Sequence, residues 1–142
     1  MKRTRAQAFR QAEQHLEQQA QVAILGAFSR TWYRDQGTLF EVLELMDDRS
    51  IVPGIIGYRP FHICATAAIA MNERAAILLD AADIEAELFV HSSDLCIALP
   101  CRMSQDVTSA SPYIEVALAR GTPVLAIWAD GNATYHRNEA TQ

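Results

Sequence analysis

The sequence predicts a doubly wound α/β domain built on a small parallel sheet, with an extra helix at its N-terminus. Four short apolar runs alternate with stretches of helical periodicity. The runs are continuous, as in strands that helices cover on both faces. The segment from Asp94 to Trp128 is the clearest example, with the pattern strand, loop, capped helix, strand. Such alternation implies right-handed crossovers between parallel strands, for which we predict the spatial order 2-1-3-4.

The composition indicates one intracellular globular unit that binds a small molecule. A chain of 142 residues, 50% of them hydrophobic, is long enough to bury one core. The net charge of −5 argues against a nucleic-acid binder, because no basic stretch is extensive enough to follow a phosphate backbone. The 3 cysteines lack the spacing of metal ligands, so we expect no metal site and a reduced, cytoplasmic protein.

Residues 1–20 are expected to form an N-terminal helical extension. Lys2 to Gln19 contains neither Gly nor Pro, and Phe9, Ala12 and Leu16 recur near helical spacing. This segment lacks the apolar core of a signal peptide, and no later segment reaches the roughly 18 apolar residues of a membrane span, so no membrane partner is expected. The apolar stripe is thin, and an isolated helix of this length is marginal in water. The helix must therefore pack on the domain or on a second subunit.

The next segments predict the first strand–helix–strand unit of a domain that we assign to residues 21–130. Val22 to Phe28 is a continuous apolar run and predicts the first strand. Thr38 to Met46 has apolar residues at the spacing of one helical face and predicts the first crossover helix. Ile51 to Ile56 is apolar but interrupted by Pro53. We therefore predict a short second strand near a sheet edge, where a missing N–H is tolerated.

The second half of the chain predicts further helices and two more strands. Ile63 to His91 is rich in Ala, Leu and Ile without Gly or Pro, which predicts helix in one or two pieces, the last from Ile84 to His91. Asp94 to Leu99 predicts the third strand and Thr122 to Trp128 the fourth. Residues 131–142 show neither pattern and are predicted to be a flexible tail.

The polar loop after the third strand and the helix that follows it contain the residues best suited to ligand binding or catalysis. In an open α/β sheet, ligands bind beyond the carboxyl ends of the strands. The loop ends in Ser111 and Pro112, a favourable N-cap and a favourable first helical residue, and Glu115 lies in the first turn. Free N–H groups, the hydroxyls of Ser109 and Ser111 and the helix dipole would suit a phosphate. Ordinary capping, with Glu115 as a surface acid that complements the dipole, predicts the same pattern.

Three segments of the chain resemble a known enzyme family. Ser93 to Leu99 begins a strand with Ser-Asp, and Ser109 to Val124 contains a helix that carries Glu in its first turn and ends in Gly shortly before Pro-Val. Ile24 to Ser29 is similar to a first strand with its substrate loop. Together these segments resemble the nucleoside 2-deoxyribosyltransferase family and its nucleoside 5′-monophosphate N-glycosidase relatives. The resemblance covers part of the chain and implies a Rossmann-like fold.

This resemblance implies cleavage of an N-glycosidic bond, by hydrolysis or by transfer, without a cofactor. At the matching position, Glu115 would attack the anomeric carbon and form a glycosyl-enzyme ester. A second acidic group would protonate the departing base. The family's Asp on the preceding helix corresponds here to Ala86, and a shift of one residue brings Glu87 into its place. Glu87 is therefore predicted to be the second catalytic residue.

The resemblance also implies which residues bind the substrate. Serines before the catalytic helix would hold a 5′-phosphate, as in relatives that act on nucleotides. The loop after the first strand would contact the nucleoside, and an aromatic ring there could stack on the base. The predicted substrate-binding residues are Gly26, Phe28, Ser29, Tyr33, Ser109 and Ser111. Because relatives often complete each other's sites, we expect a homodimer or a higher homo-oligomer.

Other interpretations are compatible with the same residues. The fold could serve as a nucleotide-sensing or protein-interaction domain without turnover. A cytokinin-activating-type phosphoribohydrolase has a similar fold, but its Pro-Gly-Gly-x-Gly-Thr loop does not follow Leu99. Cys101, with His62 or His91 as a base, is a weaker candidate nucleophile because no family signature surrounds it.

Overall fold

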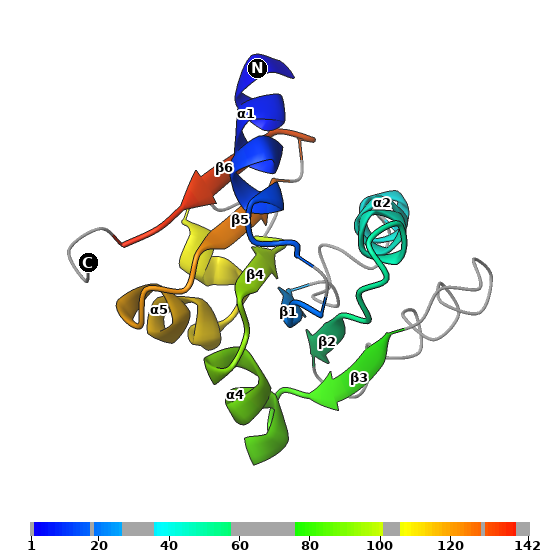
Figure 1. Cartoon of the computed structure of the whole chain (residues 1–142). Helices are drawn as coiled ribbons and strands as arrows, with labels where there is room; N and C mark the ends of the chain where they lie inside the picture. The colour runs from blue at the N-terminus through cyan, green and yellow to red at the C-terminus, as the bar shows by residue number, and fades with distance from the viewer. Residues whose placement is uncertain are drawn as a thin grey trace.

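The computed structural model of the protein describes residues 2–17, 19–26, 36–57, 76–100, 106–128 and 130–138. Strands and helices alternate along most of this part of the chain (Figure 1). In order, they are α1 (Lys2–Glu13), β1 (Val22–Leu25), α2 (Gln36–Asp47), β2 (Gly54–Gly57), β3 (Ile77–Asp80), α4 (Ile84–His91), β4 (Leu95–Ala98), the 3₁₀ helix η2 (Val107–Ala110), α5 (Pro112–Ala119), β5 (Val124–Ile127) and β6 (Ala133–His136).

The described strands form one 6-stranded sheet in the order β3-β2-β1-β4-β5-β6. The β1–β2, β1–β4, β2–β3 and β4–β5 pairs are parallel, whereas β6 is antiparallel to β5. The prediction of an α/β fold with a mostly parallel sheet is confirmed. The predicted order 2-1-3-4 is wrong for this sheet, because it left out one strand at each edge. The four strands that it did include are β2, β1, β4 and β5.

Strand β3 lies within a stretch that we predicted to be helical. Ile77–Asp80 pairs in register with Gly54–Gly57, and the Ile77 N–H donates to the Pro53 carbonyl at 2.9 Å. Leu and Ile are good or fair helix formers, but propensity differences below about 1 kcal/mol per residue yield to pairing with a neighbouring strand. The predicted end of the stretch is confirmed, since α4 spans Ile84–His91. Residues 63–75 of the predicted helix lie outside the described residues.

Strand β2 is an interior strand, which corrects the prediction that it lies near a sheet edge. It pairs with β1 on one side and with β3 on the other. Pro53 does not interrupt these ladders because it precedes the first strand residue, Gly54. Its carbonyl still takes part, by accepting the N–H of Ile77. The missing N–H therefore falls where the ladder needs no donor.

Strand β6 corrects the prediction that residues 131–142 form a flexible tail. Ala133–His136 pairs with β5, with Thr134 opposite Ala126. The indole N–H of Trp128, just after β5, donates to Thr134 Oγ1 at 2.8 Å. This short strand is only partly buried and contains polar residues, so its sequence carries no apolar run to reveal it.

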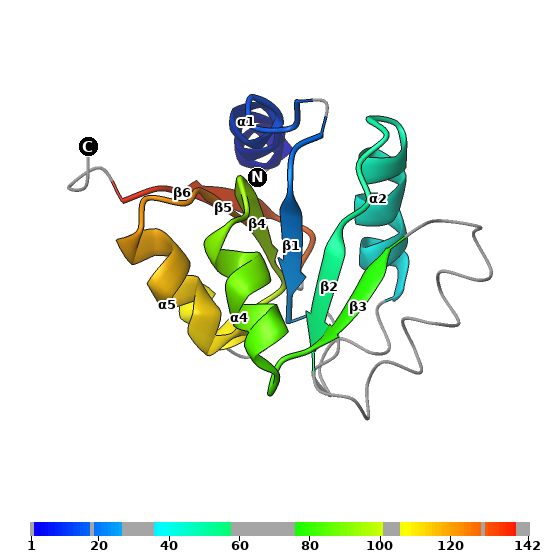
Figure 2. The same ribbon diagram turned by 60° about the horizontal axis from the view of Figure 1, so that its bottom comes forward.

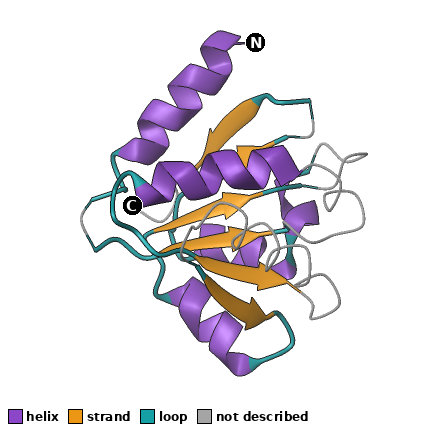
Figure 3. Cartoon of the chain, turned by 90° about the vertical axis from the view of Figure 1, so that its right-hand side faces the viewer, coloured by secondary structure: helices purple, strands orange, loops and turns teal. Residues whose placement is uncertain are grey.

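Apolar side chains on the two faces of the sheet form two separate cores. Ile24, Ile97 and Leu125 belong to the core under α1 and α2. Their chain neighbours, such as Leu25 and Ala98, belong to the core under α4 and α5. Figure 2 shows α1 and α2 over one face and α4 and α5 over the other, and Figure 3 shows the strands as the layer between helices. This layering explains why the interior strands are apolar on both faces.

Helix α1 packs on the sheet of its own chain. This is one of the two predicted arrangements, the other being packing on a second subunit. Ala8, Ala12 and Leu16 are buried in the core that α1 shares with α2. The helix ends at Glu13, several residues before the predicted end at Gln19. Because its apolar stripe is continuous with the core of the sheet, the extension gains the tertiary packing that an isolated helix lacks.

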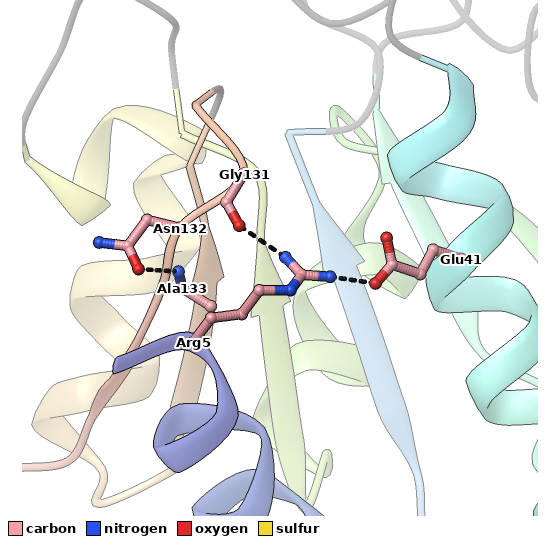
Figure 4. Close-up of polar contacts among 5 residues, drawn as sticks. All are labelled: Arg5, Glu41, Gly131, Asn132 and Ala133. Carbon is pink, nitrogen blue, oxygen red and sulfur yellow. Dashed lines mark hydrogen bonds and ion pairs between the residues drawn. The ribbon is translucent and has the colours of Figure 1, made fainter. Parts of the chain in front are cut away.

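Arg5 ties α1 to two other parts of the fold. One guanidinium nitrogen donates to the Gly131 carbonyl in the β5–β6 turn at 2.7 Å, and another pairs with the Glu41 carboxylate of α2 (Figure 4). The same guanidinium lies 4.7 Å from the centroid of the Phe9 ring. These contacts fix the N-terminal half of α1 over the sheet.

The lowered pKa values of two histidines predict that the folded state loses stability in mild acid. Burial lowers the pKa of His136, and burial together with the nearby Arg137 lowers the pKa of His15 against the opposing charges of Asp94 and Glu17. The unfolded chain therefore binds more protons than the folded chain as the pH falls through about 6.5, the usual histidine pKa. We expect this part of the stability to be complete above that pH and to be lost below it.

Urea unfolding at about pH 7.5 and about pH 5.5 measures this effect, because only the histidines change charge strongly across that interval. The comparison is between the wild-type chain and the double variant His15→Gln, His136→Gln. The difference in unfolding free energy between the two pH values should be smaller in the double variant. An equal difference in both proteins would contradict the assignment.

Candidate functional site

The order in which strands are added to the sheet reverses between the parallel strands β1 and β4, since β2 and β3 lie on one side of β1, and β4 and β5 lie on the other. The crossover from β1 to β2 runs through α2 on one face, whereas α4 and α5 lead into β4 and β5 on the other face. A ligand site of an open α/β sheet lies beyond the carboxyl ends of the strands at such a reversal. The described segments at this place are the ends of β1 and β4, η2 and the first turn of α5.

Gly26 is the point at which three of these segments meet. It follows β1 with φ +91°, and a Cβ built there would lie 2.4 Å from the Leu99 carbonyl oxygen and 3.1 Å from the Ala110 carbonyl oxygen. No side chain fits that space, and positive φ is a conformation that glycine adopts readily. Gly26 was predicted to bind substrate. In the structure its role is to allow the backbones after β1, after β4 and in η2 to approach one another.

Helix α5 is capped as the sequence predicts, and the 3₁₀ helix before it, which was not predicted, is capped as well. Ser111 is the N-cap of α5, and its Oγ accepts the N–H of Tyr113 at 3.2 Å, while Pro112 is the first helical residue. Asp106 is the N-cap of the preceding η2, and its carboxylate accepts the N–H of Thr108 at 2.9 Å. This hydrogen bond lowers the pKa of Asp106. The cap residues thus hold the start of α5 in one place at the mouth of the sheet.

Few backbone N–H groups at the start of α5 are left for a ligand, contrary to our expectation. Pro112 has none, the Tyr113 N–H donates to Ser111 Oγ, and the Ile114 N–H donates to the Ser111 carbonyl at 3.1 Å. The Ser111 hydroxyl accepts in its capping bond, so its own proton is still available as a donor. A phosphate at this helix would therefore meet a hydroxyl and the positive end of the dipole rather than a row of N–H groups.

Glu115 is exposed in the first turn of α5. It lies four residues after Ser111, the N-cap, whose extended backbone places that residue just outside the helix. Ile114 and Ala117 are buried on the other side of the helix and anchor it to the sheet. The carboxylate is thus free to meet a ligand beside the capped helix start.

Tyr113 connects the site to a fifth segment, the turn between β3 and α4, which the sequence did not reveal. Its hydroxyl donates to the Ala81 carbonyl at 2.6 Å, in the turn between β3 and α4. The bond links the first turn of α5 to the turn that precedes the first turn of α4. The two residues are 32 positions apart, and no local pattern predicts such a pair.

Glu87, the predicted second acid, is not brought to Glu115 by any contact in the described residues. Its carboxylate lies 3.9 Å from His91 Nε2, one turn further along α4. That direction leads towards the C-terminal end of the helix and away from the carboxyl edge of the sheet. Ala86, at the family's Asp position, is fully buried in the core beneath α4. Neither position presents a carboxylate to Glu115 in this conformation.

The remaining predicted residues have varied places. Phe28, Ser29 and Tyr33 lie outside the described residues. The backbone of Ser109 lies in η2, and its side chain is not described. The weaker candidate nucleophile Cys101 and its candidate base His62 lie outside the described residues. Cys96, for which no role was predicted, is buried in β4, and burial raises the pKa of its thiol to about 12.

Two classes of feature are absent from the described part of the chain. No three side chains of His, Cys, Asp or Glu gather there in a way that could hold a metal ion. No helix there combines the length and the apolar character needed to cross a membrane.

Ser111 allows the capping role to be separated from a role in binding. Ser111→Ala is expected to lower the free energy of unfolding by about 1 kcal/mol, because the Tyr113 N–H loses its partner. Ser111→Asp retains a capping oxygen and should stay within about 0.5 kcal/mol of the wild type. Its added negative charge should weaken binding of a 5′-monophosphate at least tenfold (~1.4 kcal/mol). Urea unfolding and calorimetric titration measure the two effects, and unchanged nucleotide affinity in Ser111→Asp would exclude Ser111 from phosphate binding.

Comparisons with known proteins find a distant likeness among solved structures and no match to a family or a curated protein. A scan against protein-family models finds no match, and a search of curated proteins finds none either. Among solved structures, the chain is similar to an O-methyltransferase family protein from Burkholderia thailandensis, with a TM-score of 0.49 and 15% sequence identity. The match covers 84% of this chain and 37% of that chain, so this chain spans little more than a third of the neighbour's length. At this level of similarity the neighbour's activity gives no guide to the function of this chain.

Proposed function

We propose that the protein binds a nucleoside or a nucleoside 5′-monophosphate at the carboxyl edge of β1 and β4 and cleaves its N-glycosidic bond, with Glu115 as the nucleophile. The observation that carries this proposal is the exposed Glu115 in the first turn of a capped helix, which follows directly on the 3₁₀ helix whose last residue, Ala110, lies against Gly26. The nucleoside 2-deoxyribosyltransferase resemblance supports the same residue. The proposal assigns the reaction class and leaves the base and the sugar open.

The chemistry requires a carboxylate because the sugar becomes oxocarbenium-like in the transition state. A Glu115 oxygen forms a bond to the anomeric carbon as the bond to the base breaks, and the base leaves with the electron pair and takes up a proton from an acid. Water then attacks the same carbon and releases free sugar and the Glu115 carboxylate. In a transfer reaction, a second base would take the place of water.

A 5′-phosphate would lie at the start of α5 in this arrangement. The Ser111 hydroxyl and the positive end of the helix dipole both favour an anion there. Ser111 and Glu115 are the N-cap and a first-turn residue of the same helix, so the phosphate and the anomeric carbon of one nucleotide could reach them together. The internal bonds of Tyr113 and Ile114 limit the number of donors, so nucleosides are tested beside nucleotides.

A second candidate function is nucleotide binding without turnover. The contact of Glu87 with His91 and the burial of Ala86 favour it, because a reaction needs an acid for the departing base and these positions supply none in this conformation. A binding module would use the same end of the sheet but would need no such acid.

Release of free base from a panel of nucleosides and 5′-monophosphates tests the proposal. Base is quantified by chromatography, and binding of each compound is measured in parallel by calorimetry. Base release from at least one compound is expected. Binding without release at any enzyme concentration would favour the binding module, and absence of both would exclude both functions.

A further inference from the structure

A polar cavity lies at the opposite end of the sheet from the candidate site. Its volume of about 480 Å³ is within the range of about 300–1,000 Å³ usual for small-molecule sites. It is formed where α1 ends, where β4 and β5 begin, where α5 ends and just after β6. The lining residues are Gln14, His15, Glu17, Gln19, Ala20, Ser93, Asp94, Arg120, Gly121, Thr122, Pro123 and Arg137.

The cavity is lined by two arginines whose guanidinium groups make no described contact within the fold. Arg120 follows α5 and Arg137 follows β6, and both are exposed. Within the described residues, neither guanidinium has an ion pair or a side-chain hydrogen bond, in contrast to Arg5 and Arg49, which both have carboxylate partners. Two unpaired guanidinium groups at one cavity favour a dianion, because their planar N–H pairs match phosphate oxygens.

The other polar groups of the cavity suit a hydroxylated molecule. Asp94 Oδ2 accepts the N–H of Gln21 at 2.9 Å, which fixes this carboxylate and leaves its second oxygen for a ligand. The exposed Glu17 carboxylate and the amide groups of Gln14 and Gln19 complete a lining that contains few apolar atoms. Carboxylates and amides are good partners for sugar hydroxyls, whereas an apolar ligand would leave them without partners.

We propose that this cavity binds a small hydroxylated phosphate ester, such as a sugar phosphate, with its phosphate on Arg120 and Arg137 and its hydroxyls on Asp94 and Glu17. This site is independent of the proposed N-glycosidase function. It lies at the amino ends of β4 and β5, whereas the candidate site lies beyond the carboxyl ends of β1 and β4. Failure at one site therefore leaves the other standing.

His15 is a built-in reporter of this site. Its Nε2 lies 2.7 Å from the Tyr135 hydroxyl, and its ring stacks on the Tyr135 ring with centroids 6.0 Å apart. Arg137 disfavours the charged form of His15, whereas Asp94 and Glu17 favour it. A phosphate on Arg137 would offset the arginine's charge, so binding should raise the pKa of His15.

Calorimetric titration with ribose 5-phosphate, ribose and inorganic phosphate tests the proposal. Ribose 5-phosphate should bind the wild-type chain at least tenfold more tightly than either of the other two. Arg120→Gln and Arg137→Gln should each weaken its binding about tenfold or more, the effect of losing one charge-assisted hydrogen bond (~1.5–3 kcal/mol). Arg10→Gln, which removes an exposed arginine of α1 that does not line the cavity, is the matched control.

Two further measurements locate the bound molecule. Ribose 5-phosphate would also be the sugar product of the proposed hydrolysis of a ribonucleoside 5′-monophosphate, so the titration is repeated with Ser111→Asp, which alters only the candidate site. Binding that depends on Arg120 and Arg137 should remain in this variant. NMR titration of the His15 ring should show its pKa rising with ribose 5-phosphate, and His15→Gln identifies the signal. Absence of binding, equal affinity for inorganic phosphate, or an affinity that survives both arginine substitutions would overturn the proposal.

Discussion

Replacing Glu115 by Gln is expected to lower the rate of base release by about 10³-fold or more while the affinity for the nucleoside stays within about threefold. The amide is close to the carboxylate in size but is a very poor nucleophile, and loss of a covalent nucleophile affects the transition state rather than the bound substrate. Because Glu115 is exposed and caps no neighbour, the fold should tolerate the change. Single-turnover base release and calorimetric binding measure the two quantities.

Glu85→Gln is the matched control, since it removes an exposed carboxylate from the first turn of the neighbouring helix α4. Its rate should equal that of the wild type. Glu87→Gln should lower the rate less than tenfold, because its carboxylate lies near His91 and not at the mouth of the sheet. A loss in Glu87→Gln of about 10² or more, the usual effect of removing a general acid, would restore Glu87 as the second catalytic residue.

Replacing Gly26 by Ala is expected to destabilise the fold by about 3 kcal/mol. Two effects add, because alanine is strained at φ +91° and its Cβ would lie 2.4 Å from the Leu99 carbonyl oxygen. Relief of that contact requires the backbone after β1 or β4 to move, which also displaces η2 and the start of α5. Folded Gly26→Ala protein should therefore lose nucleoside affinity as well as stability.

Gly131 separates these two effects. Its φ of +89° is nearly the same, but a Cβ built there has no atom within 4 Å. Gly131→Ala should therefore show the conformational strain alone, about 1 kcal/mol. Urea unfolding of both variants gives the difference, which measures the close approach at Gly26. Equal destabilisation by the two substitutions would contradict the convergence of backbones at this glycine.

The parts of the fold that could be predicted are those with local signals. β1, β4 and β5 are continuous apolar runs because helices cover both faces, and α5 begins at the predicted Ser111 and Pro112 because its cap is made by neighbouring residues. β3 and β6 lie at the sheet edges and owe their conformation to pairing with β2 and β5. Strand pairing over long sequence separations leaves no pattern in a four-residue segment.

The candidate site divides in the same way. The position of Glu115 in a first helical turn follows from spacing, whereas the bond from Tyr113 to Ala81 joins residues whose proximity depends on the whole sheet. The contact of Glu87 with His91 follows from their separation of four residues. The alignment with the family instead predicted that Glu87 is the second catalytic acid. The cavity at the amino edge combines the ends of five elements, so no single segment predicts it.

The most direct measurement of the proposed reaction is mass spectrometry of peptides after an acid quench of turnover. A nucleoside with fluorine at C2′ suits this measurement, because electron withdrawal destabilises the oxocarbenium-like transition state and slows release of the sugar from the enzyme. The peptide that contains Glu115 should carry the mass of the fluorinated sugar, with base released in equal amount, and Glu115→Gln should carry none. Base release with the sugar attached to another peptide, or no attached sugar and no base release from any substrate, would contradict Glu115 as the nucleophile.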